Sequence, residues 1–214
     1  MKSAIDQLVA SELVFWDFDG VIKDSLAVKA AAFEELFLAN GSDVVARVRA
    51  HHEANGGLSR FEKIPLYLDW SGIPATAEVV NEYCDRFSNL SLQRVIDSSW
   101  VPGVREYLLA HHASQNFVLL TSMPQAEADY IIKVLGISAL FRQVFGSPER
   151  KVDVIAQVLL VTGTEPSSAI MVGDTETDMA AAVANGISFL LRRTASNLSM
   201  HDTDGIFMFD DLAS

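Results

Sequence analysis

Three short apolar runs of this chain end in residues that carry oxygen atoms on their side chains, and this arrangement limits both the fold and the chemistry. The runs at residues 13–16, 117–120 and 169–172 lead into Asp17-Phe18-Asp19-Gly20, Thr121-Ser122 and Gly173-Asp174. Continuous apolar runs of this length are typical of strands buried on both faces of a parallel sheet. Open sheets of this kind bind ligands beyond the carboxyl ends of their strands, so these polar groups are expected to gather at one edge.

The rest of the chain alternates strands with helices. Two further apolar runs, at residues 187–191 and 205–209, indicate more strands. Helical patterns at residues 125–135, 151–161 and 175–184 are followed by Gly136, Gly163 and Gly186, which are typical helix stops. This order predicts an α/β fold, a Rossmann-like parallel sheet with helices on both faces.

One long interval interrupts the alternation with helices alone. Helical patterns run from the capping residues Asp24 and Ser25 to residue 38, and then over residues 43–54, 60–70 and 75–96. We therefore expect two domains: an α/β core from residues 1–23 and 98–214, and an inserted all-helical cap over residues 24–97. The natural place for such a cap is over the edge of the sheet where the strands end.

Composition excludes several classes of partner. With 16 Lys and Arg against 28 Asp and Glu, the formal net charge is −12, so neither nucleic acid nor an anionic membrane is an expected partner. Cys84 is the sole cysteine, which rules out an internal disulfide and favours a reducing compartment. No apolar run is long enough to cross a bilayer or to form a signal peptide, so a cytoplasmic location is expected. The protein could be a monomer or a dimer, and the sequence does not distinguish the two.

The carboxylates predict a metal site. Asp17 and Asp19 are two residues apart on an extended chain and so point to the same side, and Asp178 lies one helical turn after Asp174. Four acids at one sheet edge repel each other unless a cation joins them, and hard oxygen ligands at an open site favour Mg²⁺. Taken alone, Asp17 and Asp19 also fit a solvated turn, but the further ligands of a calcium-binding loop are missing.

Two further groups suit an anionic oxygen. Thr121 and Ser122 offer hydroxyls and backbone amides at a turn from strand to helix, and Lys151 stands near the start of a helix. Each has an ordinary interpretation, a helix cap or a surface lysine. Their coincidence with the carboxylates favours a role in a phosphate site.

This order of motifs resembles the haloacid dehalogenase-like hydrolase superfamily. DFDGVIKDS is similar to its first motif, LLTS to its second, Lys151 to its third and VGDTETD to its fourth. The resemblance implies nucleophilic attack on a phosphoester by Asp17 and acid–base catalysis by Asp19. It also implies Mg²⁺ bound by the Asp17 side chain, the Asp19 carbonyl and Asp174, with Asp178 bound directly or through water. Thr121, Ser122 and Lys151 would hold the phosphoryl oxygens, next to the turn at Gly20.

The expected cap carries a second resemblance, to β-phosphoglucomutase-like members. The segment from Gly57 through Arg60 to Lys63 resembles their Gly-x-Ser-Arg loop, which implies that Arg60, and with it Lys63, meets the far end of the substrate. The alternative is a turn followed by a Ser59 helix cap and two solvated cations. We expect the adjacent histidines His51 and His52 to be surface residues, because neighbours on a helix do not face one site.

Two departures from the mutase pattern bear on the reaction. Gly173 stands where mutases usually carry a glutamate, and Lys29 stands where they carry a histidine on the first cap helix. The sequence therefore predicts a Mg²⁺-dependent phosphatase of a small phosphorylated metabolite, a phosphosugar or a phosphoglycolate-like ester. A phosphosugar mutase and a non-catalytic phospho-ligand binding protein are the alternatives.

Overall fold

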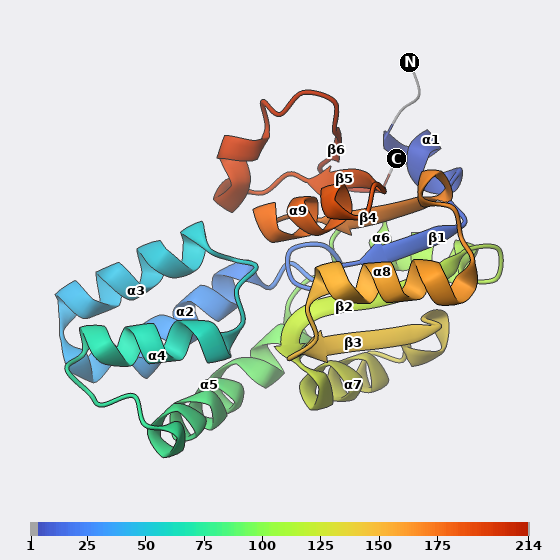
Figure 1. The fold of residues 1–214 in the computed structure, drawn as a ribbon. Coiled ribbons are helices and arrows are strands. Elements are labelled where there is room, and N and C mark those ends of the chain that lie inside the picture. The colour runs from blue at the N-terminus through green and yellow to red at the C-terminus, as the bar shows by residue number, and fades with distance from the viewer. Residues whose placement is uncertain (1–3, 214) are drawn as a thin grey trace. The chain divides into compact units, whose positions relative to one another are not determined.

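The chain divides into two compact units in a computed structural model that describes residues 4–213 (Figure 1). The sheet unit is formed by residues 1–24 and 99–214, and the helical unit by Ser25–Ser98. The helical unit is thus an insertion between the first and second strands. No helix among residues 4–213 is both long and apolar enough to span a membrane.

A six-stranded parallel sheet forms the centre of the sheet unit, as predicted. Its strand order is β3-β2-β1-β4-β5-β6. The strands are β1 (Leu13–Trp16), β2 (Asn116–Pro124), β3 (Gln143–Ser147), β4 (Ala169–Gly173), β5 (Ser188–Arg192) and β6 (Phe207–Phe209). Trp16, at the end of β1, is in register with Leu119 of β2 and Val172 of β4. The three strands that carry the motifs are therefore neighbours, with their carboxyl ends at one edge.

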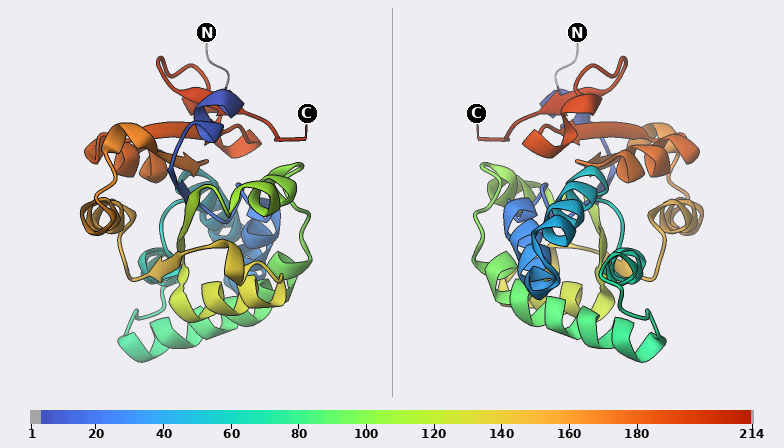
Figure 2. Two further views of the ribbon diagram at one scale, coloured as in Figure 1. Left: turned by 90° about the vertical axis from the view of Figure 1, so that its right-hand side faces the viewer. Right: turned by 90° about the vertical axis from the view of Figure 1, so that its left-hand side faces the viewer.

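Helices cover both faces of this sheet (Figures 1 and 2). The helices of the sheet unit are α1 (Ala4–Val9), α6 (Val104–His111), α7 (Gln125–Val134), α8 (Lys151–Thr162) and α9 (Glu176–Ala184). On one face, Phe15 belongs to an apolar cluster that includes Ile155 of α8 and Ala182 of α9. On the other face, Trp16 packs against Tyr107 of α6, with ring centroids 5.8 Å apart. This agrees with the continuous apolar sequence of β1, whose four residues are all buried.

Helix ends in the sheet unit follow the expected signals, while strand β3 and helices α1 and α6 were not predicted. Gly136, Gly163 and Gly186 all have positive φ, between 65° and 71°, which glycine adopts without steric cost. Strand β3 was missed because it lies at the edge of the sheet and has only one buried residue, Gly146, so it lacks an apolar run. Helices α1 and α6 were missed because they have only 6 and 8 residues.

Four helices form the helical unit: α2 (Leu26–Leu36), α3 (Ser42–Ala54), α4 (Arg60–Trp70) and α5 (Ala77–Asp97). Its apolar core is aromatic. Phe33 of α2 stacks on Phe87 of α5 at 4.0 Å between ring centroids and meets the edge of Tyr67 of α4 at 5.5 Å. Ser59 caps α4 in a capping box with Glu62, so the helix cap named in the alternative interpretation is present. Cys84 is buried in this unit and, as the sole cysteine of the chain, forms no internal disulfide.

The expectation that both adjacent histidines are surface residues is wrong for His52. Its side chain is buried, its Nδ1 lies 3.0 Å from Lys63 Nζ, and its ring packs on Phe33 with centroids 4.9 Å apart. Burial, together with the charges of Lys63 and Lys29, lowers the pKa of His52 to about 2. His52 is therefore neutral at physiological pH, and its Nδ1 accepts a hydrogen bond from the Lys63 ammonium.

This neutral histidine should make stability depend on pH. Above pH 6.5, His52 is uncharged in both the folded and the unfolded chain. Below that pH only the unfolded chain takes up the proton, so the folded state loses up to about 1.4 kcal/mol per pH unit from this group. We expect His52→Gln to remove this loss, and the free energy of unfolding of both proteins should be measured by urea denaturation from pH 7 down to pH 4. Parallel curves for the two proteins would contradict the assignment.

Candidate active site

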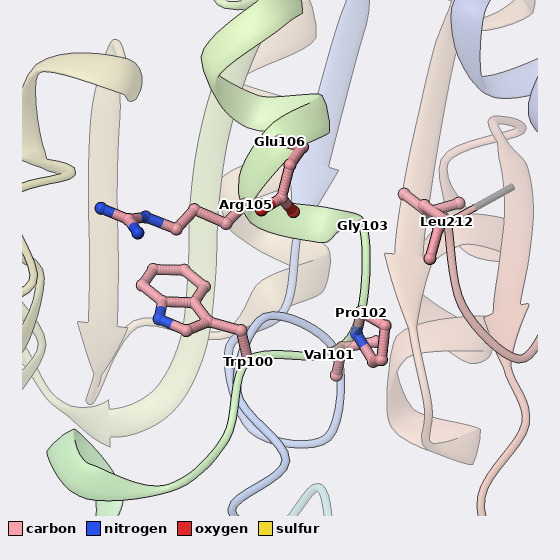
Figure 3. Close-up of a pocket in the computed structure, with 8 residues that line it drawn as sticks. Trp100, Val101, Pro102, Gly103, Arg105, Glu106 and Leu212 are labelled. Carbon is pink, nitrogen blue, oxygen red and sulfur yellow. The ribbon is translucent and has the colours of Figure 1, made fainter.

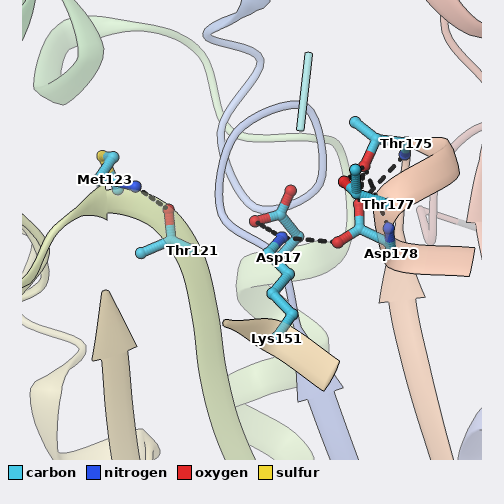
Figure 4. Close-up of polar contacts among 7 residues, drawn as sticks. All are labelled: Asp17, Thr121, Met123, Lys151, Thr175, Thr177 and Asp178. Atoms are coloured by element: carbon cyan, nitrogen blue, oxygen red, sulfur yellow. Dashed lines mark hydrogen bonds and ion pairs between the residues drawn. The ribbon is translucent and has the colours of Figure 1, made fainter. Parts of the chain in front are cut away.

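Four residues selected from the sequence meet at the carboxyl edge of the sheet unit: Asp17, Lys151, Asp174 and Asp178. Figure 4 shows three of them, Asp17, Lys151 and Asp178. Asp17 follows β1, and Asp174 follows β4, the neighbouring strand. Lys151 is the first residue of α8, and Asp178 lies in the first turn of α9. Because these elements all start or end at the same edge of one sheet, residues that lie far apart in the sequence form a single cluster.

Three carboxylates make up the acidic part of this cluster. Oxygen atoms of Asp17, Asp174 and Asp178 lie within 4.8 Å of one another, and all three residues are buried. Burial raises the pKa of Asp17 to about 7, with Lys151 acting in the opposite direction and Asp178 adding to the rise. Burial, Asp17 and Asp178 raise the pKa of Asp174 well above its usual range. The cluster therefore needs positive charge for its carboxylates to be ionised together.

Lys151 supplies one positive charge. Its Nζ lies 2.8 Å from Asp17 Oδ1 and 2.6 Å from Asp178 Oδ1 (Figure 4). Burial alone would lower the pKa of Lys151, but the two carboxylates outweigh that effect and raise it above its usual value. One lysine thus stays charged between two acids. Three acids and one lysine still leave negative charge uncompensated.

Asp178 is held by α9 as well as by Lys151. Its Oδ2 accepts hydrogen bonds from Thr175 Oγ1 at 2.6 Å and from the Thr175 backbone N–H at 3.2 Å, as part of a capping box. A Cβ atom on Gly173 would lie 2.4 Å from the Asp178 Cβ, so Gly173 is the residue that lets Asp178 approach. Since donors occupy both oxygens of Asp178, its carboxylate orients Lys151.

The carboxylate of Asp174, unlike that of Asp178, has an oxygen that no hydrogen-bond donor of residues 4–213 contacts. Its Oδ1 is buried and has no hydrogen-bond partner among residues 4–213. A buried acceptor without a partner is costly, and a hard cation would satisfy it. The unpartnered oxygen and the all-carboxylate donor set fit Mg²⁺, with Asp17 and Asp174 as the acids best placed to hold it.

The remaining predicted residues of the sheet unit lie around this cluster. Asp19 is partly exposed, and its carboxylate is not among the three that approach each other. Gly20 has φ of 75°, and its N–H donates to the Lys23 carbonyl at 2.8 Å, which closes the turn after the first motif. The hydroxyl of Thr121 is buried and accepts a hydrogen bond from the Met123 N–H at 3.2 Å, and Ser122 is partly exposed.

The predicted residues of the helical unit are buried within that unit. Arg60 and Lys63 are 6% and 2% exposed, so the alternative of two solvated cations is wrong. Arg60 lies over the Phe87 ring, 4.7 Å from its centroid, and donates to Ser88 Oγ. Lys63 lies 5.9 Å from the Phe33 centroid and contacts His52. The stacked rings of Phe87 and Phe33 therefore make cation–π contacts with Arg60 and Lys63, respectively. Gly57 lies in the turn before α4.

Sequence reasoning missed two residues that contact the cluster. Thr175 could have been found, because Thr175-x-x-Asp178 matches the spacing of a capping box. Asn197, whose Nδ2 donates to the Asp174 backbone carbonyl at 2.7 Å, has no sequence signal because it lies in an irregular segment far along the chain.

A pocket of the sheet unit lies away from these motifs, at the start of α6 (Figure 3). Trp100, Arg105 and Leu212 are among its lining residues. Gly103 has φ of 77°, and a Cβ there would lie 2.1 Å from the Leu212 backbone, so glycine allows the C-terminal segment to pack against α6. None of the residues chosen from the sequence lines this pocket.

Comparisons with known proteins agree with the motif assignment. The sequence model described as "Haloacid dehalogenase-like hydrolase" matches residues 14–191. A phosphoglycolate phosphatase of Pseudomonas savastanoi pv. phaseolicola is 26% identical over 197 residues, which cover 87% of this chain and 72% of the relative.

Solved structures share the fold at lower identity. A predicted phosphoglycolate phosphatase from Haemophilus somnus matches with a TM-score of 0.73 and 19% identity, over 95% of this chain and 96% of that one. A β-phosphoglucomutase from Clostridium difficile matches with a TM-score of 0.74 and 16% identity, over 95% of this chain and 92% of that one. At these identities the matches show a common fold.

The contact between Gly173 and Asp178 predicts the effect of a small substitution. Gly173→Ala should lower the free energy of unfolding by about 1–3 kcal/mol, because the new methyl group overlaps the Asp178 side chain. Chemical denaturation of Gly173→Ala, Asp178→Gly and the double variant measures the coupling between the two positions. Gly173→Ala should lower the free energy of unfolding less in the Asp178→Gly variant than in the wild-type protein. Equal losses in both proteins would argue against the overlap.

Proposed function

The chain belongs to the haloacid dehalogenase-like hydrolase family, and on that premise we propose that it is a Mg²⁺-dependent phosphatase acting on a small phosphorylated metabolite. The observation that carries the proposal is the buried cluster of Asp17, Asp174 and Asp178 around Lys151. A binding protein without catalysis has no need to hold a carboxylate such as Asp17 against a lysine at a sheet edge. The cluster therefore favours an enzyme over the non-catalytic alternative.

Catalysis proceeds in two steps in this proposal. An oxygen of the Asp17 carboxylate attacks phosphorus, the bond between phosphorus and the ester oxygen breaks, and Asp19 gives its proton to the leaving alkoxide. Water then attacks phosphorus and gives a proton to Asp19, the bond to Asp17 breaks, and inorganic phosphate leaves. The partial exposure of Asp19 supports this role, because it must exchange protons with the alcohol and with water.

Positive charge keeps the nucleophile ionised. Burial raises the pKa of Asp17 to about 7, and the Lys151 ammonium works against that rise. The side chains of Asp17 and Asp174 and the carbonyl of Asp19 would hold Mg²⁺, with Asp178 acting through Lys151. When bound, Mg²⁺ supplies charge that offsets the carboxylates and the phosphoryl oxygens.

The phosphoryl group is held by residues of three neighbouring elements. The Thr121 hydroxyl, the backbone amides near Ser122 and Gly20, and the Lys151 ammonium are the donors we assign to its oxygens. Lys151 is fixed by Asp17 and Asp178, so little reorganisation is needed when charge develops during the transfer.

For the substrate, we propose a phosphoglycolate-like ester or a phosphosugar with a second anionic group. The relatives named phosphoglycolate phosphatase support the first of these. We assign residues 24–97 as a cap domain and residues 1–23 and 98–214 as the core domain. Gly57, Arg60 and Lys63 are the cap residues that we assign to the second anionic group. The resemblance of this segment to the Gly-x-Ser-Arg cap loop supports this assignment.

The mutase alternative is less favoured by the fourth motif. Any side chain at Gly173, including the glutamate that the mutase pattern carries, would overlap Asp178. A mutase must also keep water from the phosphorylated aspartate while its intermediate reorients. Hydrolysis requires water at the same place, and is the reaction we assign.

The nucleophile can be tested by one substitution. Asp17→Asn should abolish phosphate release while the protein stays folded, because an amide does not attack phosphorus. Phosphate release and chemical denaturation should be measured together, with Asp153→Asn as the control, since Asp153 is an exposed acid of α8. Near wild-type turnover in Asp17→Asn would exclude the covalent mechanism.

The metal requirement can be tested by chelation. We expect EDTA to abolish phosphate release and Mg²⁺ to restore it, while Ca²⁺ does not, because the larger and less regular shell of Ca²⁺ disfavours an ordered attack. Phosphate release is measured in excess EDTA, and again after the chelator is removed and each metal is added. Full activity in excess EDTA would contradict the assignment of the carboxylate cluster.

The role of Arg60 can be tested with two substrates. Arg60→Ala should raise KM for a substrate with a second anionic group and change little for p-nitrophenyl phosphate, which has none. Arg47→Ala is the control, because Arg47 is an exposed cation of the same unit. Equal losses on both substrates would refute a role in specificity. Interconversion of sugar 1- and 6-phosphates faster than phosphate release would favour the mutase.

A further inference from the structure

A segment outside the four motifs contacts the carboxylate cluster. It follows β5 and forms a short irregular helix, Ala195–Met200, capped by Thr194. Asn197 in this segment is 5% exposed, and its backbone has non-helical angles in the middle of the turn. The region that matches the family ends at residue 191, so Asn197 lies beyond it.

The side chain of Asn197 uses its full hydrogen-bonding capacity. Its Nδ2 donates to the backbone carbonyls of Asp174 at 2.7 Å and Arg192 at 2.9 Å. Its Oδ1 accepts from the Thr194 N–H at 2.9 Å and faces His201 Nε2 at 2.8 Å. An amide has two donor hydrogens and two acceptor lone pairs, so all four are engaged. The Thr194 N–H can only donate, which fixes the orientation of the amide.

Asp174 needs such a contact because of where it lies. The ladder between β4 and β5 ends at Gly173, paired with Leu191, so the Asp174 carbonyl is the first beyond the sheet. The Asp174 Oδ1 has no hydrogen-bond partner among residues 4–213, so hydrogen bonds within the chain do not direct that oxygen. The position of the carboxylate therefore depends on the backbone, which Asn197 holds.

We propose that Asn197 is a positioning residue that holds the Asp174 backbone so that its carboxylate is placed to bind Mg²⁺. The proposal rests on the assignment of Asp174 as a metal ligand in the function proposed above. It makes the segment from Thr194 to His201 part of the metal site, although it contributes no ligand itself. Outer contacts of this kind commonly decide how tightly a site binds its metal.

Calorimetric titration of the full-length protein with Mg²⁺ tests this proposal without any substrate. Asn197→Ala and the similarly sized Asn197→Leu both lack the donor to Asp174 and add no charge. We expect each to raise the Mg²⁺ dissociation constant by about 10–100-fold. At saturating Mg²⁺ the kcat of each variant should recover towards wild type, because the donors to phosphate are unchanged.

The matched control is His201→Ala. It removes one contact to Asn197 Oδ1 but leaves both contacts of Nδ2 to the backbone. Its Mg²⁺ dissociation constant should stay close to wild type, even where its melting temperature in EDTA falls as far as that of Asn197→Ala. Asp174→Asn gives the reference for loss of a ligand.

The outcomes separate this proposal from the proposed function. Equal Mg²⁺ affinity in wild type and both Asn197 variants would overturn the positioning role and leave the phosphatase assignment intact. If the Asn197 variants bind Mg²⁺ more weakly but the wild-type protein hydrolyses no phosphate ester, the positioning role is supported and the phosphatase assignment is overturned. A wild-type protein that binds no Mg²⁺ would overturn this proposal and the metal part of the function together.

Discussion

Repulsion among three buried carboxylates is the interaction on which the rest of the site depends. Asp17, Asp174 and Asp178 are within 4.8 Å of one another, and burial makes each charge costly. Lys151 compensates part of this charge through contacts of 2.8 Å and 2.6 Å to two of the acids. Oδ1 of Asp174 has no hydrogen-bond partner within the described part of the chain, residues 4–213, and a divalent cation would satisfy it. A fold selected only for stability would not keep such a cluster, since apolar residues of similar size often stabilise a protein as well or better.

The parallel sheet explains how the cluster can form at all. Trp16 and Val172 are paired in adjacent strands, so the residues after them meet at one edge. Helix α9 begins there with a capping box, which ties Asp178 to Thr175 and leaves its other oxygen for Lys151. Gly173 makes room for that carboxylate. Each local feature, a strand end, a helix cap or a missing side chain, thus contributes to one electrostatic arrangement.

The sequence predicted the parts of the fold that carry strong local signals. Buried strands such as Leu13–Trp16 are continuous apolar runs, and the glycines after the helices mark their ends. Edge strand β3 and the short helix α6 gave no such signal. The acids and Lys151 could be named because motif spacing and strand ends locate them. His52 and Asn197 could not, because their contacts join residues 11 and 23 positions apart through tertiary packing.

The central claim is that Asp17 becomes phosphorylated during turnover, and chemical trapping of the intermediate tests it most directly. Enzyme in the course of hydrolysing a phosphate ester is quenched in acid, treated with borohydride to reduce any aspartyl-phosphate to an alcohol, digested and analysed by peptide mass spectrometry. The account predicts reduction at Asp17 and at no other acid, with Asp17→Asn as the blank. Reduction of a residue other than Asp17 would contradict the account. So would the absence of any reduced peptide from an enzyme whose slow step is hydrolysis of the intermediate, because that intermediate would then accumulate.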